Sequence, residues 1–163
     1  MPSNQPGTPA LLRPYRPSDQ EALIRLDALA LSDLSVPGLP SQFEDLKDIE
    51  TRYLQNGAFV VAEVDGAIAG MGAIRYLDRA TARINRMRVD PEYRRRGIAR
   101  TMLNWLELQA ADAGRSKILL NTLASQEAAQ QLYQGNGYVK VGEGAPDGFK
   151  VFMYEKVAGV TAK

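Results

Sequence analysis

The segment of this chain best suited to chemistry is 94–99, Arg-Arg-Arg-Gly-Ile-Ala. It lies between a strand-like run that ends at Val89 and an apolar-periodic run over 98–113 that predicts a helix. A helix N-terminus favours an anion, because its first N–H groups are unpaired and its macrodipole is positive there. Gly97 lets the backbone approach a ligand closely, and arginine adds charges that pair with phosphate oxygens. The pattern therefore predicts a site for a ligand that carries a pyrophosphate.

The chain contains no cysteine and no histidine. This composition excludes disulfides, thiolate metal sites, a cysteine nucleophile and a Ser-His-Asp triad, and we expect no bound metal. Any proton transfer must therefore use a carboxylate, a tyrosine, a lysine or water. The lack of cysteine fits a cytoplasmic protein.

Length and composition predict one globular domain, since 163 residues with 45% hydrophobic and 24% charged side chains are ordinary values. We expect a flexible N-terminal tail over 1–9, a single domain over 10–157 and a C-terminal tail over 158–163. No apolar run approaches the ~20 residues that span a bilayer, and the first residues lack the apolar core of a signal peptide. We therefore expect no membrane partner. The net charge of +1 also argues against a nucleic-acid partner.

Helices are indicated by capping signatures and apolar periodicity. Ser18 with Glu21, and Ser41 with Glu44, form capping boxes that open two helices, the second reaching about Leu54. Two further helices are expected over 98–113 and 125–135.

Strands are indicated by alternation and turn residues, over 11–15, 58–64, 67–76, 81–89, 117–122, 137–141 and 150–156. Asp65-Gly66 predicts a tight hairpin turn, and Gly70 and Gly72 predict a bulge or a close backbone approach. The strand–helix–strand order across 81–122 predicts one parallel pair.

Two blocks of the sequence match a known family pattern. Arg94, Gly97 and Ala99 fit the motif Arg/Gln-x-x-Gly-x-Gly/Ala, and a strand at 118–121 followed by Ala-Ala-Gln-Gln-Leu-Tyr-Gln-Gly-Asn-Gly-Tyr at 128–138 fits a second block. With these blocks the chain resembles the GNAT superfamily of N-acetyltransferases, which move an acetyl group from acetyl-CoA to an amine. The resemblance implies an α/β (α+β) fold with a mixed, mostly antiparallel central sheet of six to seven strands. It also implies a splayed parallel pair and about four flanking helices.

The resemblance implies acetyl-CoA as co-substrate, with backbone N–H groups of 95–100 on its pyrophosphate and Arg94 on a phosphate. The side chains of Arg95 and Arg96 are equally compatible with a solvated basic turn. The implied cofactor-binding residues are Met87, Arg88, Val89, Arg94, Arg95, Arg96, Gly97, Ile98, Ala99, Arg100, Asn121 and Tyr133.

The implied catalytic groups are the Met87 N–H and the Tyr133 phenol. The N–H would bind the thioester oxygen, where charge develops during attack, and Val89 N–H would bind the pantetheine amide. Tyr133 would protonate the departing CoA thiolate, and Asn121 would contact the pantetheine. Each of these residues also has a purely structural alternative. Met87 and Val89 would be ordinary core residues of a strand, Tyr133 would pack on the core, and Asn121 would form a turn.

No general base is evident. Arg83 stands where some relatives carry a glutamate, and it cannot act as a base. The remaining carboxylates, Asp33, Glu44, Glu63 and Asp78, are more typical of surface or capping charges. A water chain that carries the proton to solvent is at least as consistent with the sequence.

The expected function is an acetyl-CoA-dependent N-acetyltransferase that acts by direct attack in a ternary complex. Asp33, Glu44 and Asp45 make the predicted acceptor region mildly acidic, which would suit a cationic amine. A small amine, amino acid or antibiotic is favoured as acceptor, and a peptide N-terminus or protein lysine is the alternative. A non-catalytic acyl-CoA-binding module stays open, as does a homodimer through the late strands.

Overall fold

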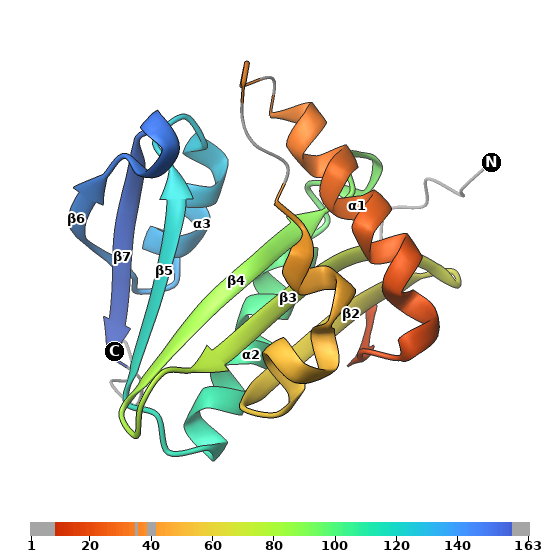
Figure 1. Ribbon diagram of the computed structural model, residues 1–163, viewed down its shortest axis with the longest axis horizontal. Coiled ribbons are helices and arrows are strands. Elements are labelled where there is room, and N and C mark those ends of the chain that lie inside the picture. Colours follow the sequence, from red (N-terminus) through yellow and green to blue (C-terminus); the bar gives the residue numbers. More distant parts are fainter. Residues whose placement is uncertain (1–8, 35, 39–41, 158–163) are drawn as a thin grey trace.

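A computed structural model describes residues 9–34, 36–38 and 42–157. Of the predicted tails over 1–9 and 158–163, residues 1–8 and 158–163 lie outside the described residues. One sheet of seven strands runs in the order β1-β2-β3-β4-β5-β7-β6 (Figure 1). Its strands are β1 Leu11–Pro14, β2 Gly57–Val64, β3 Ala67–Tyr76, β4 Thr81–Val89, β5 Lys117–Leu123, β6 Val139–Gly144 and β7 Val151–Val157. Only β4 and β5 pair in parallel, which confirms the predicted mixed, mostly antiparallel fold.

Helices cover both faces of the sheet (Figure 1). The α-helices are α1 Gln20–Asp33, α2 Ile98–Asp112 and α3 Glu127–Gly135. The 3-10 turns are η1 Pro17–Asp19, η2 Glu44–Lys47, η4 Pro91–Tyr93 and η5 Pro146–Gly148, and η3 Glu50–Leu54 is a π-helical turn. No helix in the described part of the chain is long and apolar enough to cross a membrane.

The alternation of β2 divides the core into two layers. Val60 and Ala62 pack with α2, whereas Phe59 and Val61 pack with α1, η2 and η3. Successive residues of a strand point to opposite faces of the sheet. Because helical segments cover both faces here, the side chains on both faces of β2 are apolar. This part of the sheet therefore lies between α2 and the N-terminal helical segments.

Strands β4 and β5 pair only near their beginnings and then diverge (Figure 1). Their register runs from Thr81↔Lys117 to Arg83↔Leu119, and no pairing follows towards their carboxyl ends. On its other side β4 carries a bulge against β3, where Arg86 has a φ of +58°. This divergence confirms the predicted splayed pair.

Glycine lets β3 pack tightly at the bulge. A Cβ on Gly72 would lie 2.8 Å from Met87 Sδ and 3.0 Å from Leu106 Cδ1. The predicted close approach is thus confirmed, and it lets the Met87 side chain pack directly against Gly72.

One predicted helix forms as α1 but without its predicted cap, and a second predicted helix does not form. The Ser18–Glu21 capping box is replaced by Asp19, whose carboxylate accepts the Arg16 N–H at 2.8 Å and binds Arg13. The helix predicted from Ser41 is instead the two short turns η2 and η3, and Ser41 itself lies outside the described residues.

Candidate active site

Two cavities meet in the gap between β4 and β5. A groove of about 670 Å³ lies along α2 and α3, and we call it the α2–α3 groove. A pocket of about 460 Å³, the arginine pocket, is lined by Arg52, Arg75, Arg83, Arg86 and Arg88 among others. Met87, Arg88, Gln126, Ala129 and Tyr133 line both. The gap therefore joins two compartments of different chemistry.

The N-terminus of α2 opens into the α2–α3 groove. Gly97 is its N-cap with a φ of +76°, and no side chain caps the helix or places an acid in its first turn. A Cβ built on Gly97 meets nothing within 4 Å, so the space beside it is open. The first amides of a helix have no intrahelical acceptor. This end of α2 therefore presents amides without a side-chain cap to open space, and an anion bound there stays a prediction.

The structure brings most of the predicted cofactor-binding residues together. Those that line the α2–α3 groove are Met87, Arg88, Val89, Arg94, Arg95, Gly97, Ile98, Ala99, Arg100 and Tyr133. Arg96 does not line it, and its guanidinium carbon lies 5.1 Å from the centre of the Tyr93 ring. Asn121 lines the arginine pocket instead.

Two of the predicted arginines already hold carboxylates. The Arg94 side chain pairs with Asp33, and Arg88 Nε lies 2.9 Å from Asp27 Oδ1. Their side chains thus bind neighbouring acids, and any contact with a phosphate stays a prediction.

Tyr133 stands between the two cavities. Only 6% of it is exposed, and its ring packs edge-on against Tyr138 at 5.8 Å and tilted against Tyr154 at 6.4 Å. Burial raises the pKa of Tyr133 to about 12, and the charge of Arg88 opposes that rise. The phenol therefore keeps its proton throughout the neutral range and can act only as an acid there.

The Asn121 side chain forms its hydrogen bonds beside the gap between β4 and β5, and it does not line the α2–α3 groove. With its amide oriented to satisfy both neighbours, it donates to the Leu120 carbonyl at 3.1 Å and accepts from Arg83 Nη2 at 2.7 Å. The side chain thereby helps to fix Arg83 at the point where β4 and β5 part.

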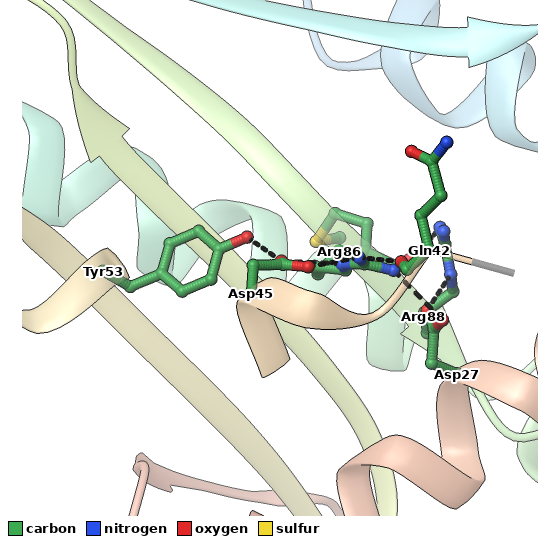
Figure 2. Close-up of polar contacts among 7 residues, drawn as sticks. Asp27, Gln42, Asp45, Tyr53, Arg86 and Arg88 are labelled. Carbon is green, nitrogen blue, oxygen red and sulfur yellow. Dashed lines mark hydrogen bonds and ion pairs between the residues drawn. The ribbon is translucent and has the colours of Figure 1, made fainter. Parts of the chain in front are cut away.

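A partly buried ion-pair network joins Asp27 and Asp45 to two arginines that line the arginine pocket, Arg86 and Arg88 (Figure 2). Asp27, 1% exposed on α1, lies 3.0 Å from Arg86 Nη1 and 2.9 Å from Arg88 Nε. Arg86 also binds Asp45 of η2 through Nε at 2.9 Å, and Tyr53 of η3 donates to the same carboxylate. Two carboxylates thus balance two arginines.

Hydrogen bonds hold the network in its charged state. Burial alone would raise the pKa of Asp45, yet the hydrogen bonds from Arg86 and Tyr53 lower it overall. Burial and the bond to Asp45 raise the pKa of Tyr53. The network ties α1, η2 and η3 to β4 beside the bulge.

The three carboxylates behind the expectation of an acidic acceptor region each have a cation beside them. Asp33 binds Arg94, Asp45 binds Arg86, and the Glu44 carboxylate lies 3.6 Å from Lys47 Nζ. These carboxylates are neutralised by neighbouring cations and do not present free negative charge to a ligand.

The other candidate bases are also occupied. Glu63 lies 2.7 Å from Arg13 Nε, and Asp78 accepts the N–H groups of Ala80 and Thr81 at 2.8 Å. Among the described residues that line the arginine pocket, Asp45 is the one carboxylate, and it is held by Arg86.

Sequence reasoning missed Arg52 and Arg75 as site residues. Arg75 interrupts an otherwise apolar run in β3, and that interruption is the signal that could have identified it. Arg52 carried no such signal, because η3 was expected to be ordinary helix.

The comparisons with known proteins agree with this geometry. The sequence model described as "Acetyltransferase (GNAT) family" matches residues 25–138. N-acetyltransferase 8 of Homo sapiens is 35% identical over 106 residues, which cover 61% of this chain and 47% of that protein. The chain thus spans about half the length of this curated relative.

Two solved structures share the fold. A GNAT-family acetyltransferase from Staphylococcus aureus Mu50 superposes with a TM-score of 0.81 at 24% identity, over 91% of this chain and 99% of that one. The yncA protein of Salmonella typhimurium, solved with its cofactor acetyl-CoA, gives a TM-score of 0.77 at 18% identity, over 94% and 96%. With a family model that matches most of its length, the chain belongs to the GNAT acetyltransferase family.

Proposed function

We propose that this protein is an acetyl-CoA-dependent N-acetyltransferase that acetylates a small primary amine by direct attack. The observation that carries the proposal is the meeting of the α2–α3 groove and the arginine pocket at Met87 and Tyr133. Two reactants that enter from the two sides would come together there without a covalent enzyme intermediate. This conclusion agrees with the family to which the chain belongs.

The α2–α3 groove fits acetyl-CoA, which would supply the activated acetyl group. The uncapped N-terminus of α2 and the open space at Gly97 suit a pyrophosphate held by main-chain amides. The yncA structure, which contains acetyl-CoA, supports this assignment by shared fold. The backbone amides of 95–100, at the start of α2, would bind the pyrophosphate.

The strand gap provides groups for the chemical step. Met87 N–H would bind the thioester oxygen and Val89 N–H the pantetheine arm, because β4 has no strand partner on that side beyond Arg83. Tyr133 keeps its proton at neutral pH and would protonate the departing sulfur. Asn121 would reach the pantetheine only by leaving Arg83.

Attack joins the amine nitrogen to the acetyl carbon and breaks the carbon–sulfur bond. The sulfur leaves with the electron pair and takes the Tyr133 proton, which solvent then replaces. The proton of the amine passes to water, since the pocket carboxylate Asp45 is bound by Arg86. A cytoplasmic location and a homodimer stay predictions.

Release of CoA measured with Ellman's reagent tests the proposal. The chain has no cysteine, so the protein contributes no thiol background. We expect release that depends on an added amine. If acetyl-CoA binds and no amine in a broad panel of small amines, amino acids and N-terminal peptides releases CoA, the protein is instead a non-catalytic acyl-CoA-binding module.

A further inference from the structure

The arginine pocket carries positive charge that the protein does not balance. Arg86 and Arg88 are neutralised by Asp27 and Asp45, as Figure 2 shows. In the described part of the chain, no carboxylate lies within ion-pair distance of Arg52, Arg75 or Arg83, which line the same pocket. Three cations therefore face the pocket without counter-ions.

The register of the sheet places two of these arginines directly opposite each other. Arg75 of β3 pairs with Arg83 of β4 across the antiparallel ladder. Like charges at directly opposed positions destabilise a sheet. In addition, Arg75 Nε is buried with no hydrogen-bond partner among the described residues. An anion between the two side chains would remove both costs.

An unsatisfied acceptor lies between this charge and the reaction site. Asn85 lines the pocket, and its Oδ1 is buried without a hydrogen-bond partner among the described residues. Along β4 it separates Arg83 from Met87, which are four positions or roughly 13 Å of strand apart. The Arg83 side chain spans part of that distance. A small molecule bound to its guanidinium can therefore reach the gap between β4 and β5.

The same charge bears on the missing general base. Nearby cations disfavour the charged form of an amine and so lower its pKa. A larger fraction of the bound acceptor is then neutral and nucleophilic. Arg83, at the position where a glutamate base was sought, would thus promote deprotonation without accepting the proton.

We propose that the acceptor is a small primary amine that carries one carboxylate or, better, two, bound by Arg75 and Arg83 with its amino group towards Asn85 and Met87. This inference rests on the proposed function and specifies its substrate class. It replaces the expectation of a cationic acceptor, since a polyamine would meet the like charges of Arg52, Arg75 and Arg83 in the pocket.

The first test compares kcat/KM across matched amines by CoA release. The panel contains aspartate, alanine, alaninamide, putrescine and phosphoethanolamine. Loss of a charge-assisted contact typically weakens binding by roughly tenfold to a hundredfold. We therefore expect kcat/KM for aspartate to exceed that for alaninamide by at least about tenfold. Putrescine or alaninamide equal to or better than aspartate overturns the inference. Phosphoethanolamine as the best acceptor would overturn the carboxylate and indicate a phosphate.

Single variants locate the contact. We expect Arg75→Gln and Arg83→Gln to lower kcat/KM for aspartate by roughly tenfold more than they lower kcat/KM for alaninamide, because only aspartate loses a carboxylate contact. Arg79→Gln is the matched control, because Arg79 is exposed and lines neither cavity. Equal losses for aspartate and alaninamide would show a merely structural role and overturn the inference.

Calorimetry with succinate separates this inference from the proposed function. Succinate carries two carboxylates and no amine, so its binding needs no turnover. We expect heat with the wild-type protein and a Kd at least about tenfold weaker with Arg75→Gln. If no amine releases CoA, the proposed function fails, and succinate binding still decides the charge preference. Absent or unchanged succinate binding refutes an anion site in the arginine pocket.

Discussion

The sharpest prediction concerns Gly97→Ala at the N-terminus of α2. Gly97 has a φ of +76° and open space where a Cβ would stand. Moving an L-residue into this conformation costs roughly 1 kcal/mol of unfolding free energy. The new methyl group also occupies the space through which a pyrophosphate approaches the amides. Loss of one charge-assisted hydrogen bond there, about 1.5–3 kcal/mol, weakens acetyl-CoA binding by roughly tenfold to a hundredfold.

Gly114→Ala is the matched control for this prediction. Gly114 has a φ of +75°, also has nothing within 4 Å of a built Cβ, and follows the other end of α2. The 15 residues of α2, roughly 22 Å of helix, separate it from Gly97. We expect the same loss of stability by urea unfolding and an unchanged Kd for acetyl-CoA by calorimetry. Equal changes in Kd for the two variants would refute the assignment of the anion site to Gly97.

Three further predictions address the strand gap. Tyr133→Phe keeps the ring packing and is expected to lower kcat by about 10²–10⁴-fold. Tyr138→Phe is the control: it loses a 3.1 Å hydrogen bond to Glu107, so it should lower the unfolding free energy by about 1 kcal/mol and leave kcat unchanged. Because the pKa of Tyr133 is about 12 when folded and ~10 when unfolded, its neutral phenol stabilises the fold below pH 10. That contribution is lost as pH rises to 12, so wild type should lose roughly 3 kcal/mol more unfolding free energy than Tyr133→Phe. Parallel urea–pH curves for the two proteins would contradict this. Asp27→Asn leaves buried arginine charge unbalanced and should lower the unfolding free energy by about 3 kcal/mol; an unchanged urea midpoint would show that the network does not stabilise the fold.

Local signals in the sequence predicted much of the fold. Asp65 and Gly66 both adopt positive φ in the hairpin, and Gly114 ends α2 with a φ of +75°, as their residue types indicate. The splayed pair followed from the family resemblance and is confirmed. The insertion of β7 between β5 and β6 was not predictable, because sheet order depends on pairings far apart in the chain.

The region 41–54 shows where local reasoning failed. Leu46, Ile49 and Tyr53 are buried against Phe59, and these tertiary contacts replace one regular helix with two short turns. Tyr53 also binds Asp45 at the side of the arginine pocket. Tertiary packing thus overrides helix propensity at this site.

The sequence predicted residues of the α2–α3 groove but not the cluster of arginines in the arginine pocket. The groove residues around Gly97 are contiguous in sequence, so a motif could identify them. Arg52, Arg75 and Arg83 come from a π-helical turn and two strands, and only folding brings them together. The acids that suggested a cationic acceptor pair with residues such as Arg86 and Arg94, which lie far away in the sequence, so their positions alone did not indicate these partners.

Initial rates with acetyl-CoA and an amine varied together test the central claim most directly. If the groove and the pocket bring both reactants to the β4–β5 gap at once, double-reciprocal plots intersect. Parallel lines would indicate that the acetyl group passes through a covalent enzyme form, and they would contradict a direct transfer in this gap.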